Sequence, residues 1–279
     1  FIEQDVVLSR DGVPVVLHDI HLDGTTDVAQ HFPARAREDG RFYAIDFSLA
    51  ELRTLRAGER RGSDGQAVFP ERFPDGPAFL PIPTLEEEIR LITGLNRTRE
   101  HQAGLYIEMK GSAFHRDHGM DLPAAVLAVL RATGWDLATD RVFLQSFEPD
   151  ALRHLRQDLA SPLPLIQLIG ENSWQEDGAA DYDFLRTPAG LDSIASYADG
   201  IGPWIPQLYR ADDDGNISST GLVEAAHARS LAVHPYTARA DALPPGIGDF
   251  AALHRLLFAQ LGVDGIFTDF PDRSRDLRE

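Results

Sequence analysis

Hydrophobic and polar positions alternate most clearly at the start of the chain. Residues 2–8 follow the period of two that is typical of a β-strand. Asp11-Gly12 then predicts a hairpin turn, and residues 13–17 form a second extended run. The first part of the chain therefore predicts two strands joined by a tight turn.

A regular alternation of helices and strands begins near residue 84. Thr84 and Glu87 have the spacing of a capping box, and we expect the helix that they open to end at Gly94. The later pattern predicts strands at 104–110, 141–147, 164–169, 199–202, 232–236 and 265–268, helices between them at 121–134, 149–159, 188–197, 219–231 and 249–261, and a short helix from 271.

Strands that alternate with helices predict parallel βαβ units. With the strand at the start of the chain, seven strands have this character. A TIM-type (β/α)8 barrel needs eight strands and about 250 residues, and it is the fold class that we expect. An open doubly wound sheet is the alternative, but no glycine-rich phosphate loop follows an early strand.

The domain organisation follows from the same pattern. We expect residues 1–279 to form a single barrel domain, with an insertion subdomain at residues 25–83, where the pattern weakens and aromatic residues recur. The chain opens at Phe1 directly on a core strand, whereas chain ends are usually polar and frayed. We therefore expect the first βα unit, including the N-terminal strand, to be missing from this sequence.

Composition and charge narrow the classes of function. The 279 residues carry a net charge of −18, which disfavours binding to nucleic acid. No apolar run approaches the length of about 18 residues that spans a bilayer, so we expect no stable membrane insertion. Among the 26 basic residues, Lys110 is the one lysine, which draws attention to its surroundings.

The first strand also carries two acidic residues. Glu3 and Asp5 are two residues apart and therefore lie on one face of the strand. Two adjacent carboxylates repel each other unless a cation or a proton lies between them, and hard oxygen ligands favour calcium or magnesium. The alternative is a pair of solvated carboxylates at a sheet edge.

Glu108 and Lys110 show the same spacing at the end of the predicted strand 104–110. An ordinary surface ion pair is one interpretation. Arginine would serve such a pair equally well in this chain, whereas lysine presents a compact charge that suits a single phosphoryl oxygen.

Further candidates lie at the ends of other extended segments. His18 is either a general acid or base or an exposed loop histidine. Gln145 and Tyr236 end later strands, where barrel enzymes bind substrate. The alternative for Gln145 is a core amide bonded to neighbouring backbone, and the alternative for Tyr236 is packing at the barrel rim. The acidic run 212–216 resembles a calcium loop only faintly and is better explained as a solvated turn.

Several of these segments resemble the glycerophosphodiester phosphodiesterase family. The resemblance is carried by Glu3-Gln4-Asp5, Asp11-Gly12, Val16-Leu17-His18-Asp19, Thr25-Thr26, Ile107-Glu108-Met109-Lys110, Gln145-Ser146-Phe147 and the run 262–271. The bacterial periplasmic branch of this family is similar to the chain in segments 27–47, 198–203 and 233–237. The resemblance extends along the whole chain.

The resemblance implies a metal-dependent hydrolase that converts glycerophosphodiesters to glycerol 3-phosphate and an alcohol. Glu3, Asp5 and Glu108 would be the ligands of Ca²⁺, with Mg²⁺ as the alternative. His18 would be one of two catalytic histidines. Lys110 and Gln145 would bind substrate, and we add Tyr236 to this group.

The family's His-Arg-Gly motif and the glutamate of the following helix are absent from this sequence. A non-catalytic phosphate-ester binding protein is therefore the alternative to an active enzyme, and a related barrel lipase acting on phospholipids is a third interpretation. The family branch implies a periplasmic location. We expect a small-molecule substrate and leave open whether the chain forms a homodimer.

Overall fold

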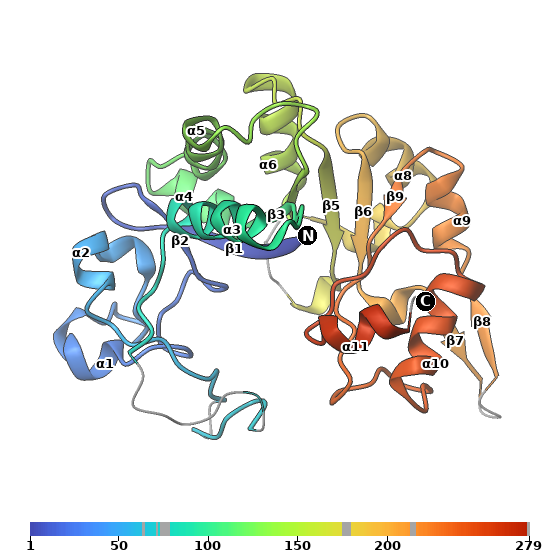
Figure 1. The fold of residues 1–279 in the computed structure, drawn as a ribbon, viewed down its shortest axis with the longest axis horizontal. Helices are drawn as coiled ribbons and strands as arrows, with labels where there is room; N and C mark the ends of the chain where they lie inside the picture. The colour runs from blue at the N-terminus through green and yellow to red at the C-terminus, as the bar shows by residue number, and fades with distance from the viewer. Residues whose placement is uncertain (63–64, 71, 73–78, 175–179, 213–215, 278–279) are drawn as a thin grey trace. The chain divides into compact units, whose positions relative to one another are not determined.

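The computed structural model describes residues 1–62, 65–70, 72, 79–174, 180–212 and 216–277 (Figure 1). Its contacts divide the chain into two compact units. The first comprises residues 1–144 and 161–163, and the second comprises residues 145–160 and 164–279.

The first unit contains a sheet and the helices that pack on it. Its elements are β1 (Ile2–Leu8), β2 (Pro14–Val16), α1 (Val28–His31), α2 (Leu49–Leu52), α3 (Leu85–Arg99), β3 (Leu105–Met109), α4 (Ser112–Asp117), α5 (Leu122–Thr133) and the start of β4 (Val142–Ser146), with 3₁₀ turns at Pro33–Arg35 and Ala44–Asp46. Strand β1 pairs antiparallel with β2 and parallel with β3. Helices α3 and α5 contact each other and β2.

The hairpin predicted from Asp11-Gly12 is confirmed. Gly12 has a φ of 75°, and its N–H donates to the carbonyl of Ser9. The N–H of Ser9 in turn donates to the carbonyl of Val13. This turn aligns β1 with β2, and His18 follows β2 after one further residue.

The segment predicted as an insertion, residues 25–83, lies within the first unit. It packs through a buried hydrophobic cluster on the hairpin of β1 and β2; the cluster comprises Val7, Val15, Leu22, Val28, Phe42, Ala44, Phe47, Leu52, Leu55 and Ile82. Burial of apolar side chains of this size contributes about 1.5–3 kcal/mol each. That this segment is an insertion in a single barrel domain stays a prediction.

The second unit repeats the alternation of strands and helices. Its elements are the end of β4, α6 (Pro149–Arg153) continued by a π-helical turn His154–Asp158, β5 (Leu165–Ile169), a 3₁₀ turn Asn172–Trp174, α7 (Tyr182–Leu185), α8 (Pro188–Ala195), β6 (Gly200–Pro203), a 3₁₀ turn Ile205–Gln207, β7 (Tyr209–Ala211), β8 (Ile217–Ser219), α9 (Leu222–His227), β9 (Ala232–Val233), α10 (Phe250–His254) continued by a π-helical turn Arg255–Gln260, and α11 (Pro271–Asp276). Strand β6 pairs parallel with both β5 and β9, and β7 and β8 form an antiparallel hairpin that the sequence pattern did not predict.

Four predicted elements differ clearly from the structure. The strand predicted at 232–236 is regular only at Ala232–Val233, and the helix predicted at 219–231 spans only Leu222–His227. Helix α3 passes through Gly94 and ends at Arg99, and the C-cap residue Glu100 adopts a left-handed conformation with a φ of 52°. The run 265–268 is not a regular strand: Thr268 forms an isolated bridge with Ala238, and two further backbone hydrogen bonds join residues 264–267 to Val233 and Pro235. Proline has no N–H to donate, so Pro235 cannot extend a ladder along this run.

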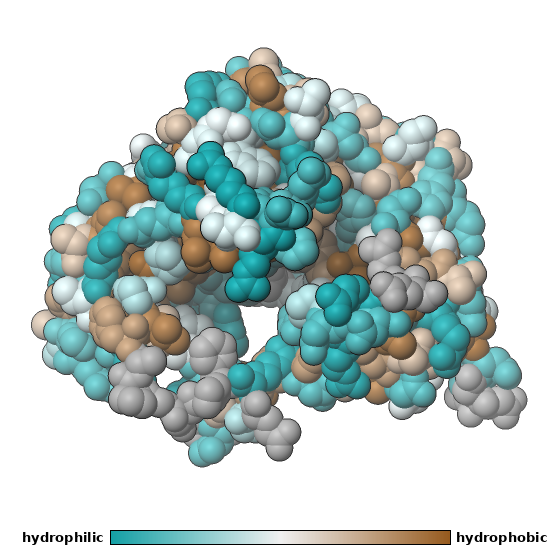
Figure 2. All heavy atoms as spheres, viewed as in Figure 1, coloured by the Kyte–Doolittle hydropathy of each residue, from teal (hydrophilic) through white to brown (hydrophobic). Residues whose placement is uncertain are grey.

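The face of the molecule in Figure 2 is largely polar. Figure 2 shows polar residues over much of the face in view, with apolar residues scattered among them. Among the described residues, no helix is long and apolar enough to cross a membrane. The acidic run 212–216 lies partly outside the described residues, so the interpretation as a solvated turn stays a prediction.

Candidate metal centre

Three carboxylates come together in the first unit. In the parallel register of β1 and β3, Asp5 lies opposite Glu108. Glu3 lies two residues before Asp5 on the same face of β1. One oxygen from each of the three carboxylates lies within 4.8 Å of the other two. The predicted metal ligands are thus adjacent to one another.

Lys110 lies against this cluster. Its Nζ is 2.6 Å from Oε1 of Glu108 and 3.4 Å from Oδ1 of Asp5. Its backbone N–H donates to the carbonyl of Val6 and so extends the pairing of β1 with β3 by one position. The side chains of Lys110 and Glu108 are 12% and 7% exposed, so this is not an ordinary surface ion pair. The one lysine of the chain therefore balances part of the carboxylate charge.

The electrostatics of the cluster favour a bound cation. Burial of the carboxyl group and repulsion from Asp5 and Glu108 raise the pKa of Glu3 to about 9, although part of the residue is open to solvent. Burial also raises the pKa of Glu108 to about 7, against the attraction of Lys110. Carboxyl groups that are costly to ionise together release protons when a cation binds.

The donor set fits a hard divalent ion. Three carboxylates supply up to six oxygen ligands, the type that Ca²⁺ and Mg²⁺ prefer, and no sulfur or imidazole atom belongs to the cluster. The residues present therefore suit the metal that the sequence implies.

His18 lies on the other side of Lys110. Its Nε2 is 3.4 Å from Lys110 Nζ, and its Nδ1 is 2.6 Å from Oδ1 of Asp19. Arg60 donates from Nη1 to the other carboxylate oxygen of Asp19 at 2.6 Å. Although burial acts in the opposite direction, the hydrogen bonds from His18 and Arg60 hold the pKa of Asp19 well below its usual range.

The chain turns sharply after Lys110. Gly111 has a φ of 60° and precedes the first residue of α4. A Cβ at this position would lie 2.9 Å from Cγ2 of Ile20, which follows the His18-Asp19 pair. Glycine therefore lets the segment that carries Lys110 approach the segment that carries His18.

Gln145 and Tyr236 belong to the second unit. Gln145 is buried near the end of β4. Tyr236 follows β9, and its hydroxyl donates to the carbonyl of Ile169 at 3.0 Å. The two residues lie in loops or strand ends at the carboxyl side of the parallel strands, as predicted, and their role toward a substrate stays a prediction.

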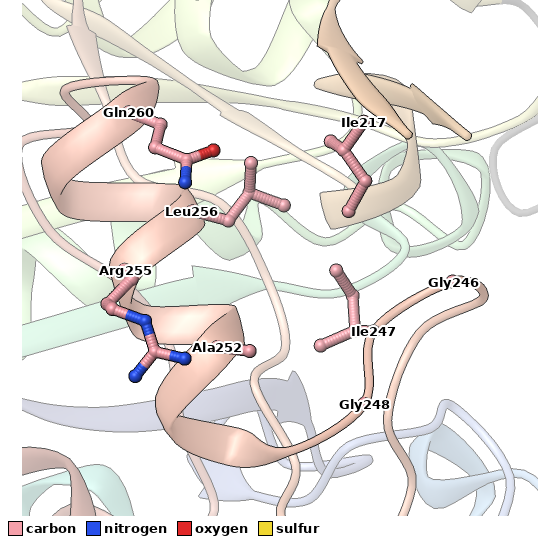
Figure 3. Close-up of a pocket in the computed structure, with 8 residues that line it drawn as sticks. All are labelled: Ile217, Gly246, Ile247, Gly248, Ala252, Arg255, Leu256 and Gln260. Atoms are coloured by element: carbon pink, nitrogen blue, oxygen red, sulfur yellow. The ribbon is translucent and has the colours of Figure 1, made fainter. Parts of the chain in front are cut away.

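The second unit also contains a pocket of about 370 Å³. It lies between β8, the loop 246–248 and the helical stretch 252–260 (Figure 3). Ile217, Ile247 and Leu256 line it with apolar surface. None of the residues predicted for the active site contributes to its lining.

Parallel βαβ units together with the carboxylate cluster define an α/β protein with a group of acidic side chains that could hold a metal ion. A model of the Glycerophosphoryl diester phosphodiesterase family matches residues 1–273. The chain therefore belongs to this family, and the prediction of a TIM-type barrel as the fold class is confirmed.

Individual relatives agree with the family model. The chain is 38% identical to the glycerophosphodiester phosphodiesterase of Haemophilus influenzae, over 98% of this chain and 80% of that protein. It is 33% identical to the glycerophosphodiester phosphodiesterase of Treponema pallidum, over 98% and 82%. Among solved structures, the glycerophosphodiester phosphodiesterase of Agrobacterium tumefaciens aligns with a TM-score of 0.60 at 25% identity, over 97% of this chain and 84% of that chain.

Sequence reasoning missed two contributors to the site region. Arg60 lies in the segment whose pattern is weakest, and no periodicity links it to Asp19. His115, in α4, is fully buried, and its Nε2 accepts a hydrogen bond from the N–H of Leu8 at 3.3 Å. The residues next to His115 in the sequence, Phe114 and Arg116, give no sign of this contact with β1.

Proposed function

We propose that this protein hydrolyses glycerophosphodiesters to glycerol 3-phosphate and an alcohol. The observation that carries the proposal is the cluster of Glu3, Asp5 and Glu108 with Lys110 beside it. The activity printed in the names of relatives at 38% and 33% identity supports an enzyme over a non-catalytic phosphate-ester binding protein.

We further propose that the resident cation is Ca²⁺ and that Glu3, Asp5 and Glu108 hold it. A bound divalent cation would stabilise negative charge on phosphoryl oxygens. The three carboxylates would hold the cation, and their negative charge would offset its positive charge. The ammonium of Lys110 supplies a further positive charge for the phosphate.

His18 handles a proton in this proposal. Lys110 Nζ can only donate, so Nε2 of a neutral His18 is the unprotonated nitrogen and can act as a base. That nitrogen takes the proton from an attacking hydroxyl of the glycerol moiety as its oxygen bonds to phosphorus. The bond from phosphorus to the alcohol oxygen breaks, the departing alkoxide takes a proton from a second acid, and a cyclic phosphate of glycerol remains. A water molecule then adds to phosphorus, the new bond from phosphorus to the ring oxygen breaks, and the protonated His18 returns its proton to that oxygen, which gives glycerol 3-phosphate.

The experiment is a coupled assay for glycerol 3-phosphate release, with and without a chelator. Wild-type protein is expected to release product with added Ca²⁺ and to stop when the ion is removed. Glu108→Gln should lose at least 100-fold in kcat at a fixed Ca²⁺ concentration, because it removes one ligand. The matched control Glu86→Gln removes an exposed carboxylate that pairs with Arg90 and should retain full activity.

The same assay separates the role of His18 from binding. His18→Ala is expected to lower kcat at least 100-fold and to leave KM within a factor of about three. His31→Ala, at an exposed histidine that pairs with Asp27, is the control. Turnover that survives in a chelator, or an unchanged rate in Glu108→Gln, would contradict the metal assignment.

Location and assembly are part of the proposal. The resemblance of segments 198–203 and 233–237 to the periplasmic branch supports a periplasmic enzyme. Cell fractionation tests this location, and sedimentation equilibrium tests whether the chain forms a homodimer.

A further inference from the structure

Asp19 connects His18 with an arginine from the segment 25–83. One oxygen of Asp19 lies 2.6 Å from Nδ1 of His18, and the other accepts a hydrogen bond of 2.6 Å from Nη1 of Arg60. The side chains of His18, Asp19 and Arg60 are 50%, 29% and 38% exposed. The imidazole thus reaches solvent, while the carboxylate that holds it is engaged on both oxygens.

The backbone around Arg60 is tied to the rest of the first unit. The N–H of Gly58 donates to the carbonyl of Thr25, and the N–H of Arg61 donates to the carbonyl of Gly24. The carbonyl of Arg60 itself accepts a hydrogen bond from the N–H of Val68. Arg60 therefore projects from a backbone that is fixed on both sides.

The segment that carries Asp19 is also fixed. The N–H of Leu17 donates to the carbonyl of Asp5 in β1, and the carbonyl of Ile20 accepts from the N–H of Ala44. These hydrogen bonds fix the backbone on each side of the His18-Asp19 pair. They therefore limit the positions that the two side chains can adopt.

The two nitrogens of His18 face groups of opposite kinds. The carboxylate of Asp19 accepts a hydrogen bond, which favours a proton on Nδ1. The ammonium of Lys110 donates, which favours an unprotonated Nε2. A neutral imidazole with this arrangement has one tautomer, and the ring is turned with Nε2 toward Lys110.

We propose that Asp19 and Arg60 are positioning residues for His18: the Asp19 carboxylate fixes the tautomer and rotation of the imidazole, and the Arg60 guanidinium fixes the carboxylate. The inference rests on the proposed function, because it assigns the proton transfer to His18. It gives the segment 25–83 a role in catalysis without any contact between Arg60 and the substrate.

An ion pair in the same segment provides the comparison. Arg41 and Asp23 are 3.1 Å apart, and their side chains are 47% and 28% exposed, close to the values for Arg60 and Asp19. Exposed pairs of this kind contribute little to stability, because solvent screens their attraction. Removing either arginine therefore has a similar small effect on folding, and a difference in catalysis would come from His18.

The kinetic test compares Arg60→Ala, Arg60→Lys and Arg41→Ala with wild-type protein. Arg60→Ala is expected to lower kcat about tenfold and to leave KM within a factor of about two, because substrate contacts persist. Arg60→Lys retains a cation and should recover most of the loss, and added guanidinium should partly restore Arg60→Ala. Asp19→Asn should lower kcat about 100-fold or more, since an amide can favour the wrong tautomer.

A second measurement does not depend on turnover. Nitrogen NMR of the histidine side chains, with the His18 signals assigned from His18→Ala, reports which nitrogen carries the proton. Wild-type protein and Arg41→Ala should show His18 protonated on Nδ1, whereas Asp19→Asn and Arg60→Ala should show a mixture of tautomers.

The outcomes distinguish the inference from the proposed function. Equal kcat in Arg60→Ala and Arg41→Ala, or an unchanged His18 tautomer in Asp19→Asn, would overturn the positioning role. If wild-type protein releases no glycerol 3-phosphate with Ca²⁺, the proposed function fails, and the NMR comparison still decides whether Asp19 and Arg60 orient the ring.

Discussion

We predict that His115 makes the stability of the first unit depend on pH. It is fully buried in α4, and its Nε2 accepts the N–H of Leu8. Protonation would remove this acceptor and bury a charge. Burial, followed by repulsion from His118, lowers the pKa of His115 from 6.5 to about 4.

The direction of the effect follows from proton binding. Between about pH 4 and pH 6.5 the unfolded chain protonates this histidine, whereas the folded chain does not. The free energy of unfolding therefore falls as the pH is lowered from 6.5 towards 4. Each pKa unit corresponds to about 1.36 kcal/mol of free energy. The fall in the pKa of His115 from 6.5 to about 4 therefore changes the free energy of unfolding by about 3 kcal/mol.

The assay is urea unfolding, followed by circular dichroism in chelator, at about pH 7.5 and about pH 4.5. The raised pKa values of Glu3 and Glu108 act in the opposite direction, because the folded state binds their protons more tightly. Wild-type protein and His115→Gln share these two carboxyl groups. The difference between the two proteins in how the free energy of unfolding changes with pH therefore isolates His115. Wild-type protein should lose about 2–3 kcal/mol more than the variant on acidification. Equal losses would refute the assignment of a neutral buried histidine.

Three further predictions concern the site and its supports. Gly111→Ala should lower the free energy of unfolding by about 1–2 kcal/mol, because φ is 60° and the new methyl group would meet a neighbour at 2.9 Å; an unchanged melting temperature would refute this. Tyr236→Phe removes the hydrogen bond to Ile169 and should cost about 1 kcal/mol in urea unfolding. An unchanged KM in that variant would argue against a substrate contact. Ca²⁺ binding near pH 8 should release protons from Glu3 and, to a lesser extent, Glu108, measured by calorimetry in buffers of different ionisation enthalpy; heats that are independent of the buffer would contradict the clustered carboxylates.

The pairing of charged residues on each strand could be predicted because it depends on local geometry, whereas only the resemblance to the family joined Glu3, Asp5 and Glu108 into one predicted ligand set. A spacing of two places Glu3 with Asp5, and Glu108 with Lys110, on one face of each strand. Parallel pairing of consecutive βαβ strands then brings Asp5 opposite Glu108. These relations follow from strand periodicity and need no knowledge of side-chain packing.

Other features depend on tertiary contacts that periodicity does not encode. Gly94 costs about 1 kcal/mol within a helix, and packing of α3 on α5 outweighs this cost, so the predicted end was wrong. Arg60 reaches Asp19 through 41 positions of chain whose polar and apolar residues show no regular pattern. Long-range pairing of this kind is decided by the packing of the segment 25–83.

Anomalous diffraction from crystals grown with Mn²⁺, in place of the lighter Ca²⁺, tests the central claim most directly. The account predicts one strong anomalous peak at ligand distance from carboxylate oxygens of Glu3, Asp5 and Glu108, and the loss of that peak in Glu108→Gln. A peak at other residues, or no peak at this cluster at a saturating concentration of the ion, would contradict it.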